Sequence, residues 1–218
     1  MPELYLKQLK LGPMENFVYL LGAKDSSEVA VIDPAWEPEQ ILAAAEADGK
    51  VITHLLVTHS HGDHVNAIAP LLEKTKAKVV AHREEVEFSE VLRGFKSELS
   101  PVRGCDVVNV GPLAVQCLHT PGHTPGSQCF HVDGALVSGD TLFINACGRC
   151  DLRGGDPEAM FRTLDTTLSR LPAETVLFPG HDYADVPTAP LSQVRASNPY
   201  LQVHDLSAFI ALRMKPRG

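Results

Sequence analysis

Residues 58–65 read THSHGDHV and place four metal-binding side chains within six positions: His59, His61, Asp63 and His64. They follow the apolar run VITHLLV at 51–57, which is typical of a strand covered on both faces. Residues two apart in an extended segment point to the same side, so the first two histidines can reach one metal ion. A turn at Gly62 would direct the aspartate and the third histidine toward a second ion. A single histidine here would favour a surface or packing role, but this cluster predicts a metal site.

Three further polar residues also lie at the ends of predicted strands. His123 follows the strand at 113–119, Asp140 ends the second strand of a hairpin at 127–140, and His181 follows the apolar TVLF at 175–178. Each of them taken alone is most simply a turn or loop residue. Because loops held by a rigid sheet commonly form functional sites, their shared position predicts one cleft with residues 59–64.

The remaining pattern predicts helices packed outside a pair of mixed sheets. Runs 16–22 and 28–34 read as a hairpin, and Asp133-Gly134 is a strong signal for a second hairpin turn. Residues 37–50, 66–77 and 83–95 read as helices, and a strand is expected at 78–82. The clearest helix is predicted at 156–171, with Asp156 as N-cap and Pro157 at the first helical position.

Composition limits the class of protein. The chain has 218 residues and a net charge of -8, which argues against binding to nucleic acid or to an anionic membrane surface. We expect one domain over residues 1–218. The five cysteines are an odd number and indicate reduced thiols, and with no secretory signal and no membrane span in the sequence they predict a cytoplasmic protein. Association into a homo-oligomer stays open.

Four motifs carry a resemblance to a known family: THSHGDH (58–64), HTPGHTPGS (119–127), SGDTLF (138–143) and PGHDY (179–183). Together they resemble the metallo-β-lactamase fold superfamily, in its glyoxalase II-like branch. The resemblance implies an α/β (α+β) fold, a four-layer αββα sandwich with the metals at the edge of the two sheets. It implies a first ion held by His59, His61 and His123, a second held by Asp63, His64 and His181, and Asp140 bridging them. The cofactor would be two divalent ions, zinc first, with iron or manganese as alternatives.

The same resemblance implies a metallohydrolase that cleaves a thioester of the hydroxyacylglutathione type through a hydroxide between the metals. Asp63 would orient that hydroxide, and Tyr183 would contact the substrate and assist catalysis. The small-molecule substrate would be thiol-derived, such as a glutathione conjugate. Arg149 stands where the branch has a lysine and could grip a substrate carboxylate, whereas Asp151 replaces an aromatic residue. Structural roles for Arg149 and Tyr183, as an ion-pair partner and a packed loop residue, are equally open.

Three alternatives remain on the same residues, one of which is a metal-binding protein without turnover. The run CGRCD (147–151) also resembles persulfide dioxygenases, which would use a single iron on His59, His123 and Asp140 to oxidise glutathione persulfide. VTHSHGDH at 57–64 differs from the sequence typical of those enzymes and favours the hydrolase. Lactone or phosphodiester hydrolysis is a further alternative, because fold alone does not choose a substrate.

Overall fold

Strand β2 (Asn16–Ala23) is buried at every position, as expected for a strand with other layers against both of its faces. It belongs to a six-stranded sheet whose spatial order follows the chain, from β1 to β6. In this computed structural model, which describes residues 2–215, β1, β2 and β3 pair antiparallel and β3 to β6 pair parallel. The strands are β1 (Leu4–Leu11), β2, β3 (Glu28–Ile32), β4 (Val51–Leu56), β5 (Lys78–His82) and β6 (Leu99–Val102).

A second sheet is formed by the later half of the chain. Its order is β12-β11-β10-β9-β8-β7, and all of its pairs are antiparallel except the parallel pair β10 and β11. The strands are β7 (Val107–Val110), β8 (Leu113–His119), β9 (Gln128–Val132), β10 (Ala135–Gly139), β11 (Val176–Pro179) and β12 (Ala189–Pro190). Both sheets are therefore mixed, as predicted.

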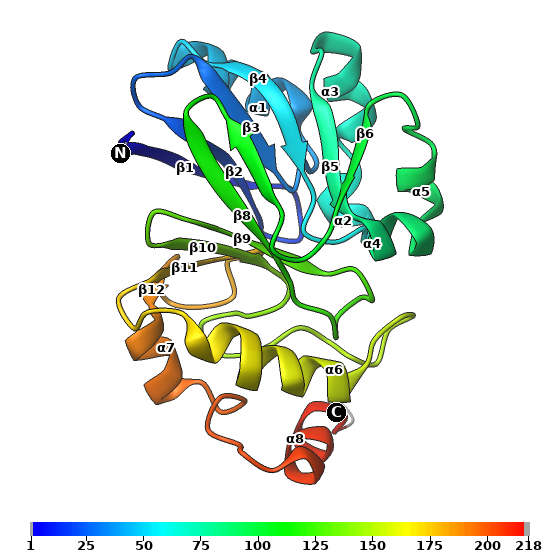
Figure 1. The fold of residues 1–218 in the computed structure, drawn as a ribbon, viewed down its shortest axis with the longest axis vertical. Helices are drawn as coiled ribbons and strands as arrows, with labels where there is room; N and C mark the ends of the chain where they lie inside the picture. The colour runs from blue at the N-terminus through cyan, green and yellow to red at the C-terminus, as the bar shows by residue number, and fades with distance from the viewer. Residues whose placement is uncertain (1, 216–218) are drawn as a thin grey trace.

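Helices cover the outer face of each sheet (Figure 1). The helices next to the first sheet are α1 (Pro38–Ala47), α2 (Gly62–Val65), α3 (Ile68–Lys74), α4 (Arg83–Phe88) and α5 (Glu90–Arg93). Those beyond the second sheet are α6 (Pro157–Arg162), which continues as a π turn (Thr163–Thr167) and a 3-10 turn (Leu168–Arg170), α7 (Leu191–Ser197) and α8 (Leu206–Arg213). The four layers form the predicted αββα sandwich.

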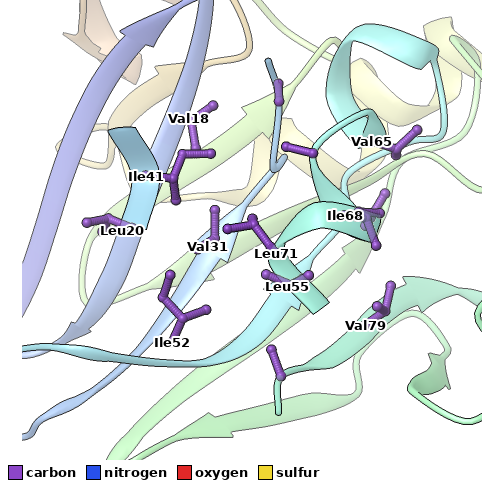
Figure 2. Close-up of a cluster of buried hydrophobic side chains, with 14 of the residues drawn as sticks. Val18, Leu20, Val31, Ile41, Ile52, Leu55, Val65, Ile68, Leu71 and Val79 are labelled. Carbon is purple, nitrogen blue, oxygen red and sulfur yellow. The ribbon is translucent and has the colours of Figure 1, made fainter. Parts of the chain in front are cut away.

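Three apolar clusters bind these layers together. Figure 2 shows the first, in which side chains of β2, β3 and β4 such as Leu20, Val31 and Leu55 pack against Ile41 and Ile68 of the outer helices. The second cluster fills the space between the sheets, and the third lies between the second sheet and α6 to α8. Truncating one of these fully buried leucines to alanine lowers the free energy of unfolding by about 2–5 kcal/mol. The strands that carry the site residues are therefore part of a well-packed core.

Most predicted elements are confirmed, and two helices differ in detail. Both hairpins form, and Asp133 and Gly134 adopt the positive φ angles of 44° and 76° that a tight turn requires. Asp156 caps its helix by accepting hydrogen bonds from the backbone N–H groups of Glu158 and Ala159. After Arg162 the helix continues as a π turn, in which the Thr166 hydroxyl donates to the Arg162 carbonyl four residues earlier at 2.7 Å, a type of bond that often bends helices.

The predicted helix at 83–95 is divided in two. Ser89 ends α4 and caps α5, where its hydroxyl accepts from the Leu92 N–H at 3.3 Å. The sequence did not predict strands β1, β6, β7 and β12 or helices α2, α7 and α8. A single domain over 1–218 stays a prediction, of which residues 1 and 216–218 lie outside the described residues. Within residues 2–215 no helix combines the length and apolar character needed to cross a membrane.

Candidate metal centre

The ends of four strands meet at one edge of the two sheets. β4 leads into residues 58–64, β8 into His123, β10 into Asp140 and β11 into His181. The ring centres of His59 lie 4.8 Å from His61 and 4.7 Å from His123, and those of His64 and His181 are 5.0 Å apart. The structure thus brings together all seven residues that the sequence predicts as metal ligands.

Three histidines form a first triad: His59, His61 and His123, with one ring nitrogen of each within 4.8 Å of the others. His123 donates Nδ1–H to the Arg149 carbonyl at 2.7 Å, so its Nε2 presents a lone pair to the site. This Nε2 lies 2.9 Å from Nδ1 of His61. His59 Nε2 is buried and has no hydrogen-bond partner among residues 2–215. A buried nitrogen without a partner fits a metal ligand.

Asp63, His64 and His181 form a second triad with the same 4.8 Å limit between their ligand atoms. The Nδ1 of His181 donates to the Met14 carbonyl at 2.9 Å, and Nδ1 of His64 lies 3.0 Å from the Asp33 carboxylate. Both Nε2 atoms therefore face the site, 3.1 Å from each other. If both rings were neutral, the lone pairs of these two nitrogens would face and repel each other. A cation or a proton between them removes this repulsion.

Asp140 lies between the triads. Its Oδ1 is 3.4 Å from His64 Nε2 and 3.3 Å from His181 Nε2, whereas its Oδ2 is 3.6 Å from His123 Nε2. Gly180 approaches this carboxylate so closely that a Cβ there would stand 2.5 Å from Oδ1. One oxygen therefore faces each triad, which is the arrangement expected of a bridging ligand.

The triads differ in charge. Burial and the neighbouring imidazoles lower the pKa of His59 well below its usual value, and the same causes lower that of His61 to about 4. Burial also opposes charge on His64, but Asp140 and Asp33 raise its pKa to about 9. For His181 burial is likewise outweighed, because the hydrogen bond and charge of Asp140 raise the pKa. Without metal, His59 and His61 are therefore neutral near pH 7, whereas His64 holds a proton.

Buried polar groups hold the predicted ligands in place. Asp33 contacts the loop at 58–64, where it accepts hydrogen bonds from the Thr58 N–H at 2.7 Å and from the Thr58 hydroxyl at 2.6 Å. Asn16 was missed: its Nδ2 donates to Asp63 Oδ2 at 3.0 Å, and its Oδ1 accepts from the Trp36 indole at 2.7 Å. Glu85, also missed, is fully buried beside the loops. No local pattern in the sequence marks Asn16 or Glu85.

The predicted substrate residues lie at the rim. Arg149 donates two hydrogen bonds to Asp151, at 2.9 and 2.8 Å, so its guanidinium already holds a carboxylate of the same loop. Tyr183 is 57% exposed, and its ring stacks on His181 with centres 4.6 Å apart and planes at 6°. The structure therefore places the Arg149 carbonyl against the first triad and the Tyr183 ring against the second.

A family model described as the metallo-beta-lactamase superfamily matches residues 11–181, more than half of the chain. The chain belongs to this superfamily. A hydroxyacylglutathione hydrolase from Polaromonas sp. (strain JS666) is 39% identical over 175 residues, which are 78% of this chain and 63% of that protein. The "Probable polyketide biosynthesis zinc-dependent hydrolase PksB" of Bacillus subtilis is 29% identical over 204 residues, 92% of this chain and 88% of the relative.

A solved superfamily structure, ETHE1 from Myxococcus xanthus, aligns with a TM-score of 0.87 at 29% identity and covers 98% of this chain and 92% of that one. The two mixed sheets with outer helices are the fold of this superfamily. The chain spans less than two thirds of the hydroxyacylglutathione hydrolase but most of the other two proteins. Imidazole and carboxylate donors grouped in this way fit divalent metal ions.

Proposed function

We propose that the chain is a metal-dependent hydrolase with a two-ion centre that cleaves thioesters of the hydroxyacylglutathione type. The observation that carries the proposal is the position of Asp140 between two complete triads of metal-binding side chains. The similarity to a hydroxyacylglutathione hydrolase supports the substrate class. Zinc is the proposed ion, in line with the zinc-dependent relative, and iron or manganese are alternatives.

Two divalent ions held by these seven residues would lower the pKa of a water molecule toward neutrality and polarise the carbonyl of the substrate. Asp63 would orient the attacking water, because Asn16 fixes its carboxylate and its Oδ2 lies 3.4 Å from His64 Nε2. The leaving thiolate is a weak base, so the site needs no strong general acid on the leaving-group side. Positioning is therefore the main task of the chain's own residues.

The rim residues would bind the substrate. Tyr183 offers an exposed ring that is fixed by its stack on His181. Arg149 would bind a substrate carboxylate by exchanging it for Asp151, and this exchange is feasible because exposed ion pairs contribute only about 0–1 kcal/mol.

The proposed location is the cytoplasm. Five free cysteines, four of them buried, fit a reducing compartment of this kind.

A second candidate is a persulfide dioxygenase with one iron on His59, His123 and Asp140. It is favoured by the structural similarity to ETHE1 over almost the full length of both chains, and by the pair Arg149 and Asp151 in the run CGRCD. Lactone or phosphodiester hydrolysis on the same centre has no specific observation in its favour.

Metal content and substrate turnover together test the proposal. The purified protein is analysed for its elements, and the same sample is assayed on S-lactoylglutathione and on glutathione persulfide. Two zinc-like ions per chain with thioester turnover are the expected result. One iron per chain with oxygen uptake on the persulfide would replace the hydrolase by the dioxygenase, and a metal-free, inactive protein would refute both.

A further inference from the structure

Glu85 is a fully buried acid on α4 that belongs to none of the motifs. It makes no ion pair with any residue that the structure describes. Burying a carboxylate without compensation is costly, so its hydrogen bonds must replace the lost water. Every donor that it meets belongs to one of the two loops that carry the first triad.

Each carboxylate oxygen of Glu85 accepts hydrogen bonds from one of these two loops. Oε1 accepts from the backbone N–H of Ser60 at 2.7 Å and from its hydroxyl at 2.6 Å. Oε2 accepts from the Thr124 hydroxyl at 2.7 Å and from the backbone N–H of Gly126 at 3.0 Å. The two backbone donors are fixed in direction, so both oxygens must act as acceptors.

The positions of these donors connect Glu85 to the ligands. Ser60 lies between His59 and His61, and Thr124 directly follows His123. Gly126 packs so tightly on α4 that a Cβ there would stand 2.0 Å from the Glu85 nitrogen. A single carboxylate thus joins the two chain segments that together supply all three histidines of the first triad.

We propose that Glu85 is a positioning residue that sets the distance between the two ligand loops and so determines the metal affinity of the first triad. Groups behind the ligands hold the ligand nitrogens where an ion needs them before it arrives. Replacement by glutamine keeps the size but leaves one acceptor oxygen, so the amide N–H₂ must face the backbone N–H of either Ser60 or Gly126. One loop then loses its fixed position. The inference rests on the proposed metal centre, but not on the proposed substrate.

Metal titration tests this inference. Metal-free protein is titrated with Co²⁺, followed by its absorption spectrum, and with Zn²⁺ against a competing chelator, while the thermal midpoint of the metal-free form is recorded. We expect Glu85→Gln to weaken the first ion by about 10- to 100-fold and to change the Co²⁺ spectrum. Glu87→Gln is the matched control, since it removes the same charge from an exposed position on the same helix and should leave both readouts unchanged.

The outcomes separate a positioning role from a merely structural one. If Glu85→Gln lowers the thermal midpoint but binds Co²⁺ with unchanged affinity and spectrum, the inference is wrong and the proposed function stands. If the wild-type protein binds neither ion, the proposed function fails and the inference fails with it.

Two milder variants keep the test decisive if Glu85→Gln does not fold. Ser60→Ala and Thr124→Val each remove one hydroxyl bond to Glu85 but keep the carboxylate and the backbone bonds. Each should weaken the first ion by about fivefold, the scale of one hydrogen bond. Wild-type affinity in both variants would overturn the inference.

Discussion

Both triads contain histidines, yet their surroundings give His61 of the first and His64 of the second opposite protonation near pH 7. In the first triad, burial among other imidazoles lowers the pKa of His61 to about 4. In the second, Asp140 and Asp33 overcome burial and raise the pKa of His64 to about 9. These two histidines, three positions apart in the sequence, therefore differ because of the residues that fold around them. His61 can bind a cation without losing a proton, whereas His64 must release one.

The largest expected effect comes from removing the residue that the two triads share. Asp140→Asn keeps the shape of the side chain but withdraws its charge from both triads, so bound metal should fall and thioester turnover should drop by at least about 100-fold. Elemental analysis and steady-state kinetics measure this, with the exposed Asp165→Asn as control. Full turnover in Asp140→Asn would show that the triads work without a bridging carboxylate.

The next effect separates the triads. His181→Ala damages only the second triad and His61→Ala only the first. In a two-ion hydrolase each variant should lose one ion per chain and at least about 100-fold in turnover.

In the single-iron alternative, neither His61 nor His181 is a ligand. Each variant would then keep its iron, and its turnover would fall by only about 10-fold. This is the lower end of the loss expected when a residue that orients metal ligands is replaced. The exposed His204→Ala is the control. Counting ions per chain in the three variants distinguishes the two mechanisms.

The charge difference predicts a maximum in the stability of the metal-free protein near pH 6.5. Below this pH, His61 of the unfolded chain binds a proton, whereas His61 of the folded chain stays neutral down to about pH 4. The free energy of unfolding therefore falls as the pH is lowered. Above it, folded His64 keeps a proton to about pH 9 that the unfolded chain has released, so stability falls again.

Denaturant unfolding of the chelator-treated protein from pH 4 to 9 measures this curve. His64→Asn should weaken the decline on the alkaline side and leave the acid side in place. A curve that is flat between pH 6.5 and 9 would contradict the opposite charging of the triads.

The smallest effects are expected at the rim. Arg149→Ala keeps the carbonyl that holds His123, so we expect unchanged metal content and a KM for the glutathione thioester raised by about fivefold or less. Tyr183→Phe keeps the ring stacked on His181 and should change kcat/KM still less. Kinetics and elemental analysis check both variants, and loss of metal in Arg149→Ala would mean that its side chain supports the first triad.

The convergence of the seven proposed ligands could be predicted from the sequence because each lies at the end of an apolar strand or within a dense motif. Strand ends share an edge of a sheet, so residues far apart in the chain, such as His61 and His123, meet there. The hairpin turn at Asp133 and Gly134 could be predicted for a different reason. These two residue types tolerate the positive φ angles that the turn requires.

The supporting residues could not be predicted, because their roles depend on contacts between distant segments. Glu85 lies in an ordinary charged helix, and only the folded chain brings Ser60 and Gly126 to its two oxygens. Asn16 is simply the first residue of a strand until the fold sets it beside Asp63. For Arg149 the sequence left an ion pair open, but only the folded chain identifies Asp151 as the partner.

The division of the chain into an earlier and a later sheet has a consequence for biosynthesis. The first sheet and four of the seven proposed ligands lie before residue 103, whereas His123, Asp140 and His181 reach the site from the second sheet. At a synthesis rate of roughly 5–20 residues per second, His181 leaves the ribosome several seconds after His123. The first triad is therefore complete on the nascent chain before the second, and loading of metal during translation would begin there.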